Sequence, residues 1–352
     1  MHSGCLSTDA ASGHPETRIC GQPGVVVPDR SPSCAPQPAL PTYETRALDV
    51  TRGELAGPGW RAPHRGVQVP VGSDPKAPMQ RIYDAAETLP RDGVVGGWVA
   101  AYLLGATELD GNGFSGTAEE SLPLLLPKRL HLSPRKGVVH WRSPLDAEDI
   151  VEIDGLRVTT PVRTAFDVGR RSRTLERAVA SLDVMARQLG VSALEVSSYA
   201  CGHPRARGLP LLRRALPLVD GRSRSVGESR LRVLWIVEAG LARPECNAYL
   251  IGGLGQVLGM PDLLLVAAGF VGEYDGAHHR DLQAHTLDNA REEDFESMGL
   301  VVVRATSLDL GPRRQLTVRR LQAGHDRAVA LGAGDADWGW RPSPLLPTVR
   351  KW

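Results

Sequence analysis

The residues best suited to chemistry lie on two short apolar segments in the C-terminal half of the chain. Asp262 opens the segment 262–266, and Glu273 lies near the end of the segment 271–274. Because side chains alternate along a strand, Asp262 falls on one face of the first strand, and Glu273 and Asp275 share one face of the second. An antiparallel hairpin of these two strands is expected to bring the three carboxylates together at one end of a sheet.

Three crowded carboxylates repel one another unless something neutralises them. A divalent cation is the natural neutraliser, and a site built only from hard carboxylate oxygens favours Mg²⁺ or Mn²⁺. The alternative is that the acids simply face solvent at the strand ends. Asp275-Gly276 is also a common turn pair, so the turn alone can explain that acid.

Two neighbouring features extend this candidate site. Ser225 and Glu228 open an expected helix upstream, where the glutamate either completes a capping box or points into the adjoining sheet end. His278 and His279 follow the acids closely in sequence. They are either solvated loop residues or groups that orient or deprotonate water.

The order of these motifs resembles that of a known bacterial group. The matching residues are 227–232, 240–241, 261–262, 273–276, 278–279, 288, 291, 299 and 302–304. The segment from about 223 to 332 is similar to an uncharacterised domain family related to very-short-patch-repair endonucleases. That family belongs to the PD-(D/E)xK nuclease superfamily.

The resemblance implies a metal-dependent phosphodiesterase: an α/β domain with a restriction-endonuclease-like mixed sheet flanked by helices. Asp262 and Glu273 would hold the metal, Glu228 would match the glutamate of the first helix, and His279 would orient water. Asp275 stands where the superfamily usually has lysine, and no lysine occurs between residues 137 and 350. A metal held by carboxylates stabilises the charge that develops during phosphodiester cleavage and lowers the pKa of its bound water.

The preceding part of the chain carries a second resemblance, to AbiEi-type abortive-infection antitoxins. It rests on residues 48–55, 65–70, 97–105 and 158–167. It implies an α+β region that belongs to a DNA-binding regulator with a cognate toxin as partner. Arg163 and Asp167 in this region have the i, i+4 spacing of an ion pair on one helix face, which we prefer to a catalytic role.

Composition and the two resemblances together divide the chain into four parts. Composition predicts a disordered tail over 1–43 and a polar tail over 333–352. The resemblances imply an antitoxin-like α+β region over 44–220 and a nuclease-like domain over 221–332. No apolar run reaches the roughly 18–20 residues of a membrane helix, and the N-terminus lacks the apolar core of a signal peptide. A cytoplasmic protein without membrane contact is therefore expected.

Charge separates the candidate metal site from the candidate DNA contacts. Residues 221–310 contain 8 arginines and 13 acids, which suits a metal site better than tight nonspecific DNA binding. Residues 151–220 hold 11 arginines against 7 acids, and 311–352 hold 8 basic residues against 3 acids. DNA is expected along these flanks, unless they are ordinary solvated helix faces. The candidate contacts are Arg205, Arg207, Arg213, Arg214, Arg313, Arg314, Arg319 and Arg320.

Two functions of different classes follow from these patterns. The first is a metal-dependent endonuclease that hydrolyses DNA, in phage defence or DNA repair. The second is a non-catalytic DNA-binding regulator of antitoxin type whose nuclease-like domain is degenerate. The set of Asp262, Glu273 and His279 favours the enzyme, and the missing lysine favours the regulator.

Overall fold

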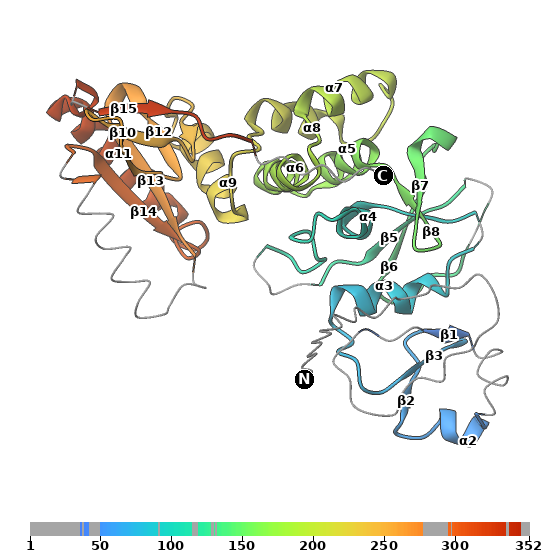
Figure 1. Ribbon diagram of the computed structural model, residues 1–352. Helices are drawn as coiled ribbons and strands as arrows, with labels where there is room; N and C mark the ends of the chain where they lie inside the picture. Colours follow the sequence, from blue (N-terminus) through green and yellow to red (C-terminus); the bar gives the residue numbers. More distant parts are fainter. Residues whose placement is uncertain are drawn as a thin grey trace, which may run out of the picture.

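The computed structural model describes residues 36, 39–41, 50–90, 92–114, 119–127, 130, 132–276, 295–296, 298–335 and 338–345. Within them the chain is a mixed α/β protein whose helices flank four β-sheets (Figure 1). The sheets run from a small N-terminal one, through a five-stranded one, to two in the C-terminal part. In the described part of the chain, no helix has both the length and the apolar character needed to cross a lipid bilayer.

The small N-terminal sheet has the strand order β1-β3-β2 and is antiparallel throughout. Its elements are β1 (Leu40–Pro41), α2 (Arg52–Leu55), β2 (Trp60–Arg61) and β3 (Val67–Pro70). Leu40 pairs with Gln68, so the prediction of a disordered tail over 1–43 does not hold for residues 40–41. Residues 1–35 lie outside the described residues.

A five-stranded mixed sheet of order β6-β5-β4-β8-β7 follows. The elements in this part are α3 (Pro78–Ala86), β4 (Val94–Val95), α4 (Gly97–Leu104), β5 (Leu122–Leu125), β6 (Val138–Trp141), η2 (Ala147–Asp149), β7 (Ile150–Ile153) and β8 (Leu156–Thr159). The turn Asp154-Gly155 joins β7 to β8 as the sequence predicts. The two residues have φ values of 49° and 74°, which a two-residue type I′ hairpin requires.

Helices of the middle region share one core with this sheet. They are α5 (Pro161–Arg171), α6 (Leu175–Leu189), α7 (Ala193–Gly202) and α8 (Leu209–Ala215), followed by the short turn η3 (Leu216–Leu218). Ser192 and Glu195 form the capping box predicted at the start of α7, and Gly190 ends α6 with a φ of 70°. Phe166 of α5 and Met185 of α6 lie in the buried core that joins the helices to the strands.

A four-stranded mixed sheet of order β14-β13-β12-β9 carries the predicted site. Its strands are β9 (Glu245–Cys246), β12 (Leu263–Leu265), β13 (Phe270–Asp275) and β14 (Val301–Thr306); the turn η5 (Val266–Ala268) follows β12. One face packs against α9 (Val226–Val233), its π-helical continuation η4 (Leu234–Glu238) and α11 (Arg314–Leu331). Gly324 permits the close approach of α11, because an added Cβ would lie 2.7 Å from Val303 and 2.8 Å from Phe270.

The other face of this sheet packs against a three-stranded sheet of order β11-β10-β15. Its strands are β10 (Tyr249–Gly252), β11 (Val257–Gly259) and β15 (Trp338–Arg341), and the turn η6 (Ala333–Asp335) precedes β15. Leu264 and Val271 of the larger sheet pack with Leu250 of the smaller one. Because β15 pairs with β10, the prediction of a polar tail over 333–352 does not hold for residues 338–341.

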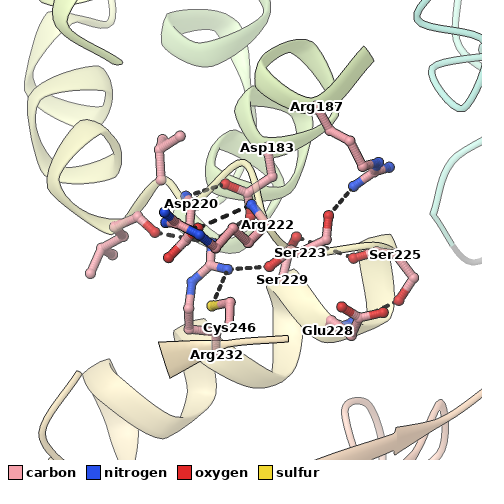
Figure 2. A network of polar contacts seen from close by, with 12 residues as sticks. Asp183, Arg187, Asp220, Arg222, Ser223, Ser225, Glu228, Ser229, Arg232 and Cys246 are labelled. Carbon is pink, nitrogen blue, oxygen red and sulfur yellow. Dashed lines mark hydrogen bonds and ion pairs between the residues drawn. The ribbon is translucent and has the colours of Figure 1, made fainter. Parts of the chain in front are cut away.

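A buried polar network crosses the predicted domain boundary between residues 220 and 221 (Figure 2). Arg232 of α9 and Asp183 of α6 form an ion pair at 2.5 Å, with both side chains 0% exposed. Arg232 also donates to the carbonyl of Leu218 at 3.0 Å and lies 3.4 Å from the thiol of Cys246. The two predicted regions therefore share a polar core although their sheets are separate.

Candidate functional site

Asp262 and Glu273 lie side by side at the end of the β12–β13 hairpin. Leu263 pairs with Gly272, so Asp262 and Glu273 occupy the next position of the ladder. The backbone N–H of Asp262 donates to Glu273 Oε1 at 3.1 Å, and the backbone N–H of Tyr274 donates to Asp262 Oδ2 at 2.7 Å. The two hydrogen bonds between the strands fix both carboxylates at one end of the sheet.

Glu228 is connected to this pair through Asn247, a residue not predicted from the sequence. The Asn247 side-chain amide donates to Glu228 Oε2 at 2.7 Å, and the Asn247 backbone N–H donates to the carbonyl of Asp262 at 3.0 Å. Glu228 is 6% exposed, and its Oε2 also accepts from the backbone N–H of Arg224 at 2.7 Å. The backbone N–H of Glu228 donates to the Ser225 hydroxyl at 3.1 Å. The glutamate therefore helps to cap α9 and also faces the sheet end.

The backbone of Asn247 makes this connection possible. Its φ of 49° lies in the left-handed region, which asparagine tolerates better than most residues. Its side-chain amide donates a second hydrogen bond, to the carbonyl of Arg222 at 2.9 Å. The sequence signal for this role is only an asparagine after a short strand, which is too common to identify a site residue.

Asp275 lies two residues beyond Glu273 on the same strand. It is the exposed last residue of β13, in register with Thr306 of β14. Asp262 and Glu273 thus meet at the hairpin end, and the participation of Asp275 in the same site stays a prediction.

Tyr274 positions helix α9 against the same strand. An added Cβ on Gly227 would lie 1.9 Å from the Tyr274 ring, so glycine is needed where α9 approaches β13. Burial raises the pKa of the Tyr274 hydroxyl, the charge of Arg230 opposes this, and Asp275 adds to it. This contact holds the first turn of α9, and with it Glu228, close to the carboxylate pair.

The two histidines predicted to act on water, His278 and His279, lie outside the described residues. The predicted water-orienting role of His279 therefore stays a prediction.

Four of the eight arginines predicted to contact nucleic acid differ in their surroundings. Arg213 and Arg214 are exposed on α8, and Arg313 is exposed at the start of α11. Arg314 forms ion pairs with two glutamates, one on α6 and one on η4. The charge of Arg314 is thus balanced within the protein, whereas the other three arginines extend toward solvent.

The three-residue group that could hold a metal is Asp146, Asp149 and His203, among the described residues. Asp149 already accepts from Arg163 Nη1 at 2.7 Å and from the Tyr199 hydroxyl at 2.7 Å. His203 Nδ1 lies 2.8 Å from the carbonyl of Tyr199. Because a buried guanidinium already pairs with the central carboxylate, a cation would be repelled there, and the group does not suit a metal.

The predicted i, i+4 ion pair of α5 is present. Arg163 Nε donates to Asp167 Oδ2 at 2.9 Å. Both side chains are buried, at 1% and 0% exposure, so the pair belongs to the core rather than to a solvated helix face. Asp167 Oδ1 also accepts from Arg170 Nε at 2.8 Å.

The fold and site define a mixed α/β protein with a carboxylate pair at one sheet end. The chain is 27% identical over 214 residues to two proteins of Mycobacterium tuberculosis, which covers 59% of this chain and 75% of each relative. They are "Uncharacterized protein MT2308" of strain CDC 1551 / Oshkosh and "Uncharacterized protein Rv2248" of strain ATCC 25618 / H37Rv. No family model matches the chain, and no solved structure matches it.

Proposed function

We propose that this chain is a metal-dependent, endonuclease-like protein that hydrolyses phosphodiester bonds of DNA in the cytoplasm, in phage defence or DNA repair. One observation carries the proposal: Asp262 and Glu273 lie side by side at the end of the β12–β13 hairpin, where the Asp262 N–H donates to Glu273 and the Tyr274 N–H donates to Asp262. Asn247 connects the buried Glu228 to the same place. Carboxylates held side by side in this way are typical ligands of a divalent cation.

The order of elements around the site supports a restriction-endonuclease-like arrangement. Helix α9 comes first, strands β9, β12 and β13 follow as antiparallel neighbours, and β14 then lies parallel to β13. Helix α11 packs on the same face as α9. Such a sheet places the carboxylates of the central hairpin at one edge, within reach of the first turn of α9.

The donors at the hairpin end fit Mg²⁺ or Mn²⁺. Carboxylate oxygens are the hard ligands that these cations prefer. Asp262 and Glu273 would hold the ion, Glu228 and Asp275 would complete the acidic surroundings, and His279 would orient water. When bound, the ion stabilises negative charge on the phosphate and lowers the pKa of water.

DNA is the proposed substrate, with the exposed arginines as its contacts. Arg213, Arg214 and Arg313 extend toward solvent, where they can neutralise phosphates. Arg314 is a weaker candidate because two glutamates already pair with it.

A second candidate function is a non-catalytic DNA-binding regulator of antitoxin type with a cognate toxin. The exposed position of Asp275 at the end of β13 favours it, because the superfamily usually has lysine there. A regulator of this type would bind DNA through the arginines without cutting it.

Calorimetric titration of the full chain with Mn²⁺ and Mg²⁺ tests the proposed site. The variants are Asp262→Asn and Glu273→Gln, which keep an oxygen that can accept the neighbouring backbone amide. The control is Asp326→Asn, because Asp326 is an exposed carboxylate on α11 with its side chain 83% exposed. We expect at least tenfold weaker binding in both site variants and no change in the control. Equal binding in all four proteins would rule out the site.

A further inference from the structure

A basic pocket of about 830 Å³ opens in the middle region of the chain, away from the β12–β13 hairpin. It lies between β6, α5 and the connection from α7 to α8. Among the described residues that line it, none is Asp or Glu. Six are arginines: Arg142, Arg163, Arg170, Arg171, Arg205 and Arg207.

Arg163 brings a buried and unsatisfied donor to this pocket. The residue is 1% exposed, and its Nη1 donates to Asp149 Oδ2 at 2.7 Å and to the carbonyl of Pro144 at 2.9 Å. Its Nη2 is also buried but has no hydrogen-bond partner among the described residues, and the same holds for His140 Nε2 in the pocket wall. Buried polar groups are nearly always paired, so Arg163 Nη2, which can only donate, indicates a missing acceptor, and His140 Nε2 indicates a missing polar partner.

Arg171 adds a second guanidinium to the pocket. Its positive charge, unlike that of Arg163, is poorly balanced. It stacks over Trp141, 4.2 Å from the ring centroid, and its Nε lies 3.9 Å from the closest Asp167 oxygen. That Nε is buried without a hydrogen-bond partner. Burial lowers the pKa of Arg171 to about 10, and the positive charge of Arg170 adds to the shift while Asp167 opposes it. An anion in the pocket would relieve this excess of positive charge.

The wall formed by the connection from α7 to α8 is fixed against α5. Arg170 Nη1 donates to the carbonyl of Arg207 at 2.8 Å. Gly208 follows with a φ of 90°, and an added Cβ there would lie 2.0 Å from the carbonyl oxygen of Arg170. The side chains of Arg205 and Arg207 are exposed at the pocket mouth. The pocket is therefore a built feature with buried donors inside and cations at its entrance.

We propose that this pocket binds a phosphate group, with Arg163 and Arg171 inside and Arg207 at the mouth as its ligands. The planar guanidinium presents paired donors that match phosphate oxygens, which makes arginine the preferred residue for this recognition. The volume lies within the roughly 300–1,000 Å³ of small-molecule sites. It admits a phosphate carried by a free nucleotide or by the 5′ end of a DNA strand. The inference goes beyond the proposed nuclease-like function, because no residue of the acidic site takes part.

The test is calorimetric titration of the full chain in EDTA with four probes. They are pyrophosphate, ADP and one short single-stranded oligonucleotide with either a 5′-phosphate or a 5′-hydroxyl. The variants are Arg171→Gln and Arg207→Gln. Because Arg207 has an exposed side chain, Arg207→Gln tests the pocket even if Arg171→Gln fails to fold. The control is Arg327→Gln, which removes one exposed positive charge from α11.

We expect saturable binding of pyrophosphate that both pocket variants weaken by roughly tenfold or more and the control leaves unchanged, as expected for charge-assisted hydrogen bonds. Tighter binding of ADP than of either oligonucleotide would support the proposed pocket and would identify a free nucleotide as its ligand. Tighter binding of the 5′-phosphorylated strand than of its 5′-hydroxyl counterpart would support the proposed pocket and would identify the 5′ end of a DNA strand as its ligand. No saturable binding of any probe, or equal weakening by Arg327→Gln, would overturn the proposal.

Discussion

Asn247 joins three parts of the acidic site with one side chain and one backbone amide. It contacts Glu228 of α9, the carbonyl of Asp262 and the carbonyl of Arg222. A neutral amide beside a buried carboxylate satisfies that carboxylate without a positive charge. The contacts of Asn247 with Glu228 thus add no positive charge beside that carboxylate.

Substitution of Asn247 by alanine should destabilise the protein by about 1–3 kcal/mol, since the change leaves Glu228 with one fewer donor and strains a left-handed backbone. Asn247→Gly is the matched variant, because glycine adopts this backbone conformation without strain but also lacks the amide. Urea unfolding should place the glycine variant between wild type and alanine. If Glu228 belongs to the metal site, Mn²⁺ affinity should fall in both variants. Unchanged affinity in both would limit Asn247 to a structural role.

For single residues, the alternation of side chains along a strand and the pairing of the two strands were enough to predict that Asp262 and Glu273 meet. The same rule places Asp275 on the strand face of Glu273, at the exposed end of β13, but a shared face does not specify how far apart two side chains lie. Asn247 could not be predicted, since its partners are brought to it by the tertiary fold. The ion pairs of Arg314 with two glutamates distant in sequence could not be predicted for the same reason.

At the scale of secondary structure, Asp309 organises the turn from β14 into α11. The backbone N–H and the hydroxyl of Thr306 each donate to Asp309 Oδ2 at 2.9 Å. The Thr317 hydroxyl donates to the carbonyl of Asp309 at 2.9 Å, and Arg320 lies 3.5 Å from the carboxylate. Burial alone would raise the pKa of Asp309, but the bonds from Thr306 and the charge of Arg320 lower it overall.

A lowered pKa in the folded state means that the ionised Asp309 stabilises the protein at neutral pH. The stabilisation is present above the unfolded pKa of about 4 and is lost as the pH falls through the lower folded value. Asp309→Ala should therefore cost about 1–2 kcal/mol at pH 7, and the difference from wild type should shrink below about pH 4. Urea unfolding of both proteins from pH 7 to below about pH 4 measures this difference in the free energy of unfolding. The exposed Asp326→Ala should change stability by less than about 0.5 kcal/mol, and a pH-independent loss in Asp309→Ala would contradict the account.

Elements with local signals were predicted best. The Asp154-Gly155 hairpin and the Ser192–Glu195 capping box each depend on a few adjacent residues. The short strands β1 and β15 were missed because each is stabilised by a partner far away in sequence, β3 and β10 respectively. Composition rich in Pro, Gly and polar residues made both segments look like tails.

At the scale of the whole molecule, the ion pair of Arg232 and Asp183 links the two halves of the chain. The residues around it belong to α6, to the connection before α9 and to β9, as Figure 2 shows. Burial raises the pKa of Asp183, and the charge of Arg232 opposes that effect. Such a pair is costly to bury but more costly to break.

Arg232→Met should destabilise the full chain by about 3–5 kcal/mol, because the buried Asp183 carboxylate loses its counter-charge. The double variant Asp183→Leu/Arg232→Met removes both charges and keeps apolar volume. It should be more stable than Arg232→Met alone. Urea unfolding followed by circular dichroism and by tryptophan fluorescence measures both variants. A single variant as stable as wild type would show that the pair does not join the two halves energetically.

The position of this pair explains why a boundary at residues 220–221 could not be judged from sequence. The connector before α9 is rich in arginine and looks solvated, yet the carbonyl of Leu218 in it accepts a hydrogen bond from Arg232 of α9, which is 0% exposed. Its partner lies 49 residues away, on a helix of the preceding region. A buried ion pair between residues so far apart in sequence leaves no local pattern in composition or periodicity.

The most direct test of the central claim is a cleavage assay on plasmid and single-stranded DNA with Mg²⁺ or Mn²⁺. The full chain is compared with Asp262→Asn and with the exposed control Asp326→Asn. We expect metal-dependent cleavage that EDTA abolishes, that Asp262→Asn slows by about 10²-fold or more, and that the control leaves intact. DNA left uncut by the wild-type chain with either metal, or cut by Asp262→Asn at the wild-type rate, would contradict the assignment of the carboxylate pair as a nuclease site.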